Sequence, residues 1–238
     1  MRQNIRVFYI VTCIVTVFTV TLVLLFYFLT FPLSPEKIYE QAIECIVEIK
    51  AMTGENATSY GSAVIVSNDG ELITNAHVVT YSKLSMIIEF ISYSIRFSFE
   101  EYYREVELIK YDTELDLAVL KLKELPSFEL KSLKKADSDK VKSGQNVYAV
   151  GNAQNHGIGI TQGCISIPLL KINYQERIID VIKCDLTITE GNSGGALLNE
   201  RGKLIGITTF RLKDNDVNVV QGVAYCIPSN IAYTYLLD

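Results

Sequence analysis

Three side chains in this sequence are of the types that nucleophilic catalysis combines: His77, Asp116 and Ser193. Ser193 stands in the segment 191–195, Gly-Asn-Ser-Gly-Gly, directly before an apolar run. Glycines permit a tight backbone turn that aims amide groups at a developing oxyanion, and the serine supplies the attacking oxygen. Taken alone, the segment also fits a glycine-rich turn between two strands.

The sequence offers two histidines as a general base for this serine. His77 directly follows an apolar run, in the segment Thr-Asn-Ala-His-Val-Val, whereas His156 stands in a polar stretch. A lone histidine in a polar stretch is usually structural or solvated. We therefore take His77 as the candidate base and expect His156 to have no catalytic role.

An acidic residue, Asp116, opens the apolar run Leu117–Leu122. Burial of a carboxylate costs several kcal/mol unless the group is paired or hydrogen-bonded, so an acid at this position needs a partner. A histidine ring nitrogen is a suitable one. The neighbouring Asp112 is the better candidate for capping a turn.

The N-terminal part of the chain is much more apolar than the rest. No charged residue occurs from Val7 to Phe31, and about 20 apolar residues are enough to cross a bilayer. A cleaved signal peptide is the alternative, but it has a shorter apolar region and a small-x-small cleavage site, which does not follow here. Arg2 and Arg6 precede the run, so the positive-inside rule places the N-terminus in the cytoplasm. We expect a single-pass cell-membrane protein whose remaining residues face outward.

The sequence pattern of the rest of the chain is typical of an all-β protein. Short β-branched and aromatic runs recur between turn residues, at 46–49, 62–66, 72–74, 86–90, 117–122, 147–150, 178–182, 204–208 and 223–227. Many short strands at such spacing indicate an antiparallel barrel or sandwich. Helix is expected only at Pro35–Ala42 and Ser229–Leu237. We divide the chain into a cytoplasmic tip and anchor (1–31), a linker with a short helix (32–44) and one domain (45–238).

Composition narrows the classes of ligand. A net charge of −5 with a pI near 5.2 argues against nucleic-acid binding. Four cysteines (Cys45, Cys164, Cys184 and Cys226) are scattered without the spacing of a zinc site, so we predict no metal and no other cofactor. We favour buried free thiols over two disulfides, because a core of this size does not need cross-links.

The local sequences, in the order His, Asp, Ser, resemble trypsin-like serine proteases of the HtrA/Deg type. The motifs that carry the resemblance are 61–66 (Gly-Ser-Ala-Val-Ile-Val), 74–79, 116–120, 150–152, 160–163 and 191–195. The resemblance implies a chymotrypsin-like double β-barrel, with His77 and Asp116 on the first barrel and Ser193 on the second. It also implies a His-Asp-Ser triad and an oxyanion hole made by the N–H groups of Gly191 and Ser193.

Further expectations follow from the resemblance. Thr187 falls at the floor of the primary substrate pocket, where an uncharged residue suits small aliphatic side chains. Many members carry a C-terminal PDZ domain, but the segment 222–230 resembles the end of the protease domain, so we expect none here. The implied activity is endoproteolysis of unfolded or misfolded cell-envelope proteins, and homo-oligomerisation is left open.

Two other functions compete with endoproteolysis. A catalytically silent protein-binding or chaperone-like module on the same fold is the main alternative, because fold alone does not prove activity. An esterase of the α/β-hydrolase type is disfavoured, because its Gly-x-Ser-x-Gly motif and its residue order are absent.

Overall fold

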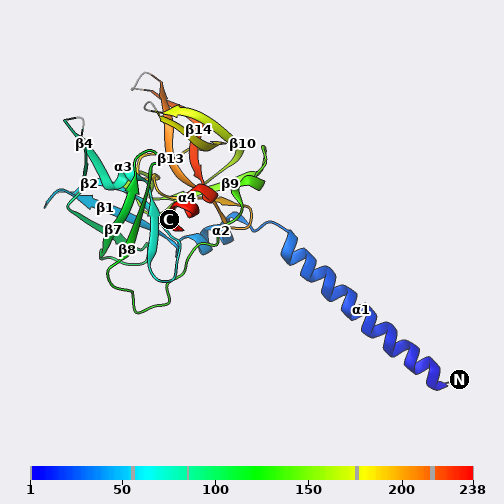
Figure 1. The fold of residues 1–238 in the computed structure, drawn as a ribbon. Coiled ribbons are helices and arrows are strands. Elements are labelled where there is room, and N and C mark those ends of the chain that lie inside the picture. Colours follow the sequence, from blue (N-terminus) through cyan, green and yellow to red (C-terminus); the bar gives the residue numbers. More distant parts are fainter. Residues whose placement is uncertain (1, 55–56, 85, 175–176, 215–217, 238) are drawn as a thin grey trace. The chain divides into compact units, whose positions relative to one another are not determined.

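The computed structural model describes residues 2–54, 57–84, 86–174, 177–214 and 218–237, and it divides into two units, 1–33 and 34–238. The first unit is the helix α1 (Arg2–Thr30). It is the blue helix in Figure 1, and its stretch Ile5–Phe26 has a mean hydropathy of 2.5. By length and composition it is a candidate membrane span, as the sequence predicts.

The second unit begins with α2 (Pro35–Ala42), which has the bounds that the sequence predicts. The Ser34 side chain caps the helix by accepting from the Lys37 N–H, and Pro35 suits its first turn. Ile38 and Ala42 are fully buried, and the Tyr39 hydroxyl donates to the Ile158 carbonyl at 2.8 Å. The helix therefore packs as part of the compact unit.

Two closed barrels of six strands each follow, which confirms the predicted chymotrypsin-like architecture. The first contains β1 (Ile46–Met52), β2 (Ala57–Ile65), β3 (Glu71–Thr74), β6 (Ser92–Arg96), β7 (Arg104–Asp112) and β8 (Leu117–Leu122), in the order β1-β2-β3-β8-β7-β6. Inward-facing aliphatic and aromatic side chains fill it, among them Ile49, Ile65 and Phe97, each fully buried. Burial of each such side chain contributes about 1.5–3 kcal/mol to folding.

The second barrel contains β9 (Asn146–Gly151), β10 (Gly159–Tyr174), β11 (Arg177–Asp185), β12 (Ala196–Asn199), β13 (Leu204–Asp214) and β14 (Asn218–Pro228). Their order is β10-β11-β14-β13-β12-β9, and two long hairpins extend from it (Figure 1). Ile165, Ile182 and Leu197 lie in its core. The free thiols of Cys184 and Cys226 are buried in the same core. Of the four cysteines for which the sequence favours buried free thiols, Cys45, Cys184 and Cys226 are free and buried, whereas Cys164 is free and half-buried.

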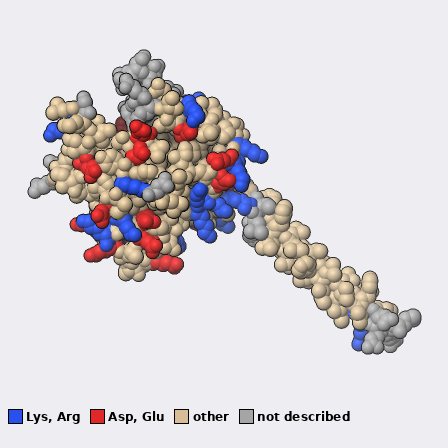
Figure 2. Space-filling view, viewed as in Figure 1, with Lys and Arg blue, Asp and Glu red and all other residues tan. Residues whose placement is uncertain are grey.

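Short elements connect the strands and close the domain. The helix α3 (Ala76–Val79) follows β3, and the hairpin β4 (Thr80–Lys83) with β5 (Met86–Glu89) forms a separate two-stranded sheet. The 3-10 turns η1 (Ser138–Lys140) and η2 (Ala153–Asn155) flank β9. The final helix α4 (Ser229–Leu237) also has its predicted bounds. Figure 2 shows acidic and basic side chains mixed over the visible face of this unit.

Candidate active site

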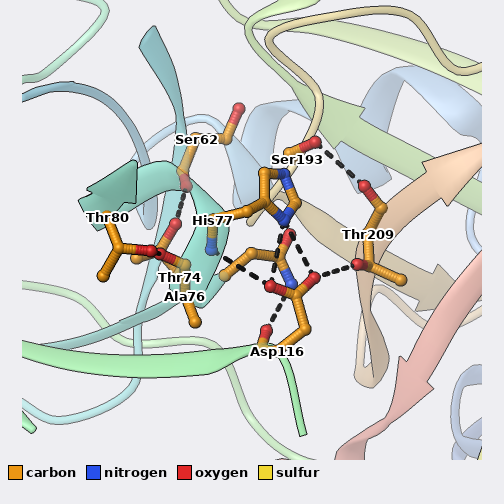
Figure 3. A network of polar contacts seen from close by, with 9 residues as sticks. Ser62, Thr74, Ala76, His77, Thr80, Asp116, Ser193 and Thr209 are labelled. Carbon is orange, nitrogen blue, oxygen red and sulfur yellow. Dashed lines mark hydrogen bonds and ion pairs between the residues drawn. The ribbon is translucent and has the colours of Figure 1, made fainter. Parts of the chain in front are cut away.

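The candidate base and the candidate acid meet in the first barrel (Figure 3). His77 lies in α3 and Asp116 directly precedes β8. The Nδ1 atom of His77 lies 3.0 Å from Oδ1 and 2.9 Å from Oδ2 of Asp116. The backbone N–H of His77 also donates to Asp116 Oδ1, at 3.1 Å. The two contacts with one oxygen fix the histidine and the carboxylate relative to each other.

Asp116 adopts a left-handed backbone conformation, with φ at 54°. Asparagine and aspartate tolerate this region better than other residues with a Cβ atom. The Asn75 side chain donates to the Asp116 carbonyl at 2.9 Å, and the Thr209 hydroxyl donates to Oδ2 at 2.5 Å. The carboxylate thus has donors from both barrels, since Thr209 belongs to β13.

The pKa of His77 is raised above 6.5. Desolvation acts to lower it, but the charge of Asp116 and the hydrogen bond to Asp116 outweigh desolvation. The imidazolium form is therefore stabilised, as a general base requires once it has taken a proton. The His77 side chain keeps 48% of its surface exposed, so substrate can reach it.

The loop that carries the serine requires glycine at two positions. Gly191 has φ at 92° and Gly194 has φ at 82°, where residues with a Cβ atom are strained. A Cβ atom at Gly191 would collide with the Asn152 carbonyl oxygen, and one at Gly194 with the Ser62 carbonyl oxygen. The backbone conformation and the close approach of these two carbonyl oxygens therefore require glycine at 191 and 194.

Ser193 and His77 lie side by side across the two barrels (Figure 3). The Ser193 hydroxyl donates to the backbone carbonyl of Thr209 at 2.9 Å. Within the described residues it makes no hydrogen bond to His77. Rotation of the hydroxyl group is needed to direct its proton at the histidine.

Ser62 joins the serine loop to the first barrel. Its N–H donates to the Ser193 carbonyl at 2.8 Å, and its hydroxyl donates to the Gly191 carbonyl at 2.7 Å. The same hydroxyl accepts from the Asn152 N–H at 2.8 Å. In the described part of the chain, the N–H groups of Gly191 and Ser193 have no hydrogen-bond partner. Both N–H groups are therefore available as donors to a ligand.

The other predicted residues lie as follows. Thr187 is exposed and is not among the residues that line the cavity beside Ser193. His156 is an exposed loop residue. Asp112 caps a turn by accepting from the N–H groups of Glu114 and Leu115, at 2.7 and 2.9 Å. Among the described residues, no group of three or more His, Cys, Asp or Glu side chains is placed to hold a metal ion.

Comparison with known proteins agrees with this architecture. The family model for a trypsin-like peptidase domain matches residues 61–207. Serine endoprotease DegS from Haemophilus influenzae is 32% identical over 173 residues, which cover 72% of this chain and 47% of that protein. The chain belongs to the HtrA/Deg family of trypsin-like serine proteases.

Two further similarities support the HtrA/Deg assignment. The periplasmic pH-dependent serine endoprotease DegQ of Escherichia coli is 35% identical over 175 residues, 73% of this chain and 36% of DegQ. The solved structure of the HtrA-type protease AlgW with a tripeptide has a TM-score of 0.74 at 29% identity, covering 86% of this chain and 63% of AlgW. The chain thus spans less than half the length of DegS and of DegQ.

Sequence reasoning did not assign a role to three polar residues of this HtrA-family site. Ser62 lies inside the motif 61–66, but the motif alone does not show that Ser62 contacts the serine loop. Asn75 directly follows β3 and lies two residues before His77. Thr209 is far from both motifs in the sequence, and only closure of the second barrel brings it to Asp116.

Proposed function

We propose that this HtrA-family chain is a serine endopeptidase with His77, Asp116 and Ser193 as its triad. The observation that supports this proposal best is the pairing of His77 Nδ1 with Asp116 beside Ser193. An ionised carboxylate only accepts hydrogen bonds, so the shared proton is on Nδ1. The Nε2 atom is then the free acceptor for the Ser193 proton.

The reaction then follows the serine-protease template. The Ser193 hydroxyl turns from the Thr209 carbonyl to His77, and Ser193 Oγ attacks the substrate carbonyl as His77 takes its proton. The N–H groups of Gly191 and Ser193 bind the oxyanion. His77 then gives the proton to the leaving amine, and water, activated by the same histidine, hydrolyses the acyl-enzyme.

The proposal extends to substrate and location. We infer that α1 is a retained single-pass anchor with a cytoplasmic N-terminus, so that residues 34–238 act outside the cell membrane on unfolded or misfolded envelope proteins. We further propose that Thr187, six residues before Ser193 and uncharged, selects small aliphatic side chains before the scissile bond. Cleavage after Lys or Arg requires a buried carboxylate to offset desolvation of the substrate cation.

A fluorophosphonate probe tests the nucleophile directly. The full chain in detergent should be labelled on the peptide that contains Ser193, and Ser193→Ala should lose both labelling and peptide hydrolysis. Loss of a triad serine typically lowers turnover about 10⁶-fold. The exposed loop residue Ser127 provides the control, since Ser127→Ala should react as the wild type does. Absence of labelling in folded wild-type protein would instead support the catalytically silent binding module.

A further inference from the structure

A cavity of about 350 Å³ lies directly beside the candidate nucleophile. Its walls come from both barrels, with Ser59, Tyr60 and Val78 from the first and Asn155 and Glu190 from the second, and His77 and Ser193 line it as well. A cavity of this size holds one or two side chains of a bound peptide.

The position of His77 indicates which part of a substrate the cavity receives. Nδ1 of His77 faces Asp116, so Nε2 is the atom that returns the proton to the leaving amine. The leaving amine must lie within hydrogen-bond reach of that atom. His77 and Ser193 both line the cavity, so a leaving amine within reach of Nε2 lies at this cavity. The cavity therefore receives the residues that follow the scissile bond.

Glu190 carries the one carboxylate among the cavity-lining residues. Its side chain is exposed, and in the described part of the chain the carboxylate has no ion pair and no hydrogen bond. Its backbone is held in place, because the Glu190 carbonyl accepts from the Gln154 N–H at 2.7 Å. The backbone of Glu190 is thus held in place, while its carboxylate can pair with a charged group of a ligand.

The charge of Glu190 also matters for the reaction. Glu190 and Gly191 line the same cavity, and the Gly191 N–H is a proposed oxyanion donor. A carboxylate that faces the same cavity opposes the negative charge that develops there. A cation brought by the substrate would neutralise that carboxylate at the same moment. The cavity thus favours a cationic side chain both in binding and in the transition state, and it disfavours an acidic one.

We propose that this cavity is a subsite for a Lys or Arg side chain on the C-terminal side of the scissile bond, with Glu190 as the residue that selects it. The proposal rests on the proposed endopeptidase function and adds a specificity to it. Tyr60, 40% exposed, offers an aromatic surface along which the apolar stem of such a side chain can lie. Exposed ion pairs are worth up to about 1 kcal/mol, so we expect an effect of about fivefold in kcat/KM.

Peptide sets that differ only in the first or second residue after the scissile bond test the subsite. With the full chain in detergent, kcat/KM should decrease in the order Lys, Gln, Glu. Glu190→Gln should abolish this order and raise activity on the Glu peptides, and Glu190→Lys should reverse it. Glu107→Gln removes an exposed carboxylate of β7 outside the cavity and should leave the order unchanged. Added salt should weaken the preference in the wild type.

Three results would overturn the subsite. They are equal kcat/KM for the three peptides in the wild type, a preference that survives in Glu190→Gln, and a charge preference that appears only for residues before the scissile bond. Each leaves the endopeptidase function intact, because the peptides are still cleaved in a Ser193-dependent manner. Failure to cleave any peptide in that manner overturns both proposals.

Discussion

Thr209 Oγ1 lies 2.5 Å from Asp116 Oδ2 and joins β13 of the second barrel to the acid of the first barrel. The backbone carbonyl of the same threonine accepts from the Ser193 hydroxyl. One residue therefore contacts both the proposed acid, Asp116, and the proposed nucleophile, Ser193. Since the three groups come from two barrels, Thr209 couples the distance between the barrels to the geometry of the site.

Replacement of Thr209 by valine removes the hydroxyl and keeps the side-chain shape. Hydrogen bonds to charged groups contribute about 1.5–3 kcal/mol, so we expect kcat to fall by about 10- to 100-fold. KM should change little, because the hydroxyl touches Asp116 and not the proposed substrate cavity. Thr209→Ser keeps the hydroxyl and should retain most of the activity. Steady-state kinetics on one peptide measures both, and equal losses in the two variants would contradict the role of the hydroxyl.

The raised pKa of His77 predicts the acid limb of the pH–rate profile. A general base must be neutral, so kcat/KM falls as the pH drops through the pKa of free His77. Because that pKa is raised, the midpoint of the limb should lie above about 6.5. Asp116→Asn removes the charge that raises it and leaves desolvation, which lowers it. The variant's limb should therefore move to lower pH, with kcat reduced by about 10⁴-fold.

NMR titration measures the pKa of His77 independently of the kinetics. The chain has two histidines, so His156→Gln leaves His77 as the one imidazole signal. His156 is exposed and lies outside the cavity lining, so this variant should keep wild-type activity. An NMR midpoint below about 6.5 would contradict the dominance of Asp116 over desolvation.

Ser62→Ala should affect stability as well as activity. The change leaves the N–H of Asn152, a residue that is 1% exposed, without its acceptor, and it frees the Gly191 carbonyl. A buried donor without a partner costs about 1–3 kcal/mol. We expect Tm to fall by about 2–4 °C for each kcal/mol, and kcat to fall because Gly191 is less well held. Ser127→Ala serves as the stability control, and an unchanged Tm in Ser62→Ala would refute the linking role of Ser62.

Elements with strong local signals could be predicted from the sequence. Capping by Ser34 and the proline after it set the start of α2, and the apolar run of β8 matches its strand from Leu117 to Leu122. The strands β6 and β7 were not predicted. In β7, exposed Glu105 and Glu107 alternate with inward residues, so that the run looks polar although one face packs on the barrel.

In the candidate site, too, features with a local sequence pattern could be predicted, and features that depend on tertiary packing could not. Residue type and local motif were enough to name His77, Asp116 and Ser193 as candidates, because glycine neighbours and an acid at the start of an apolar run are local features. The structure places these three residues at one site. The contact of Thr209 with Asp116 depends on how two barrels pack, which no local pattern encodes. The direction of the Ser193 hydroxyl depends on its side-chain rotamer and on the Thr209 carbonyl of β13 that accepts its hydrogen bond.

The last prediction concerns the proposed role of α1 as a membrane anchor. Ile5–Phe26 is long and apolar enough to span a bilayer, and Arg6 lies at its N-terminal end. The full chain should therefore stay in the membrane pellet after alkaline extraction, and protease added to intact cells should digest residues 34–238. An arginine at the centre of a spanning helix costs about 2.5–3.5 kcal/mol on insertion scales. The double variant Val15→Arg, Val17→Arg should therefore leave the pellet, whereas Val15→Leu, Val17→Leu should stay. Soluble protein lacking the first 31 residues would instead identify the helix as a cleaved signal, and protection of the domain in intact cells would reverse the orientation.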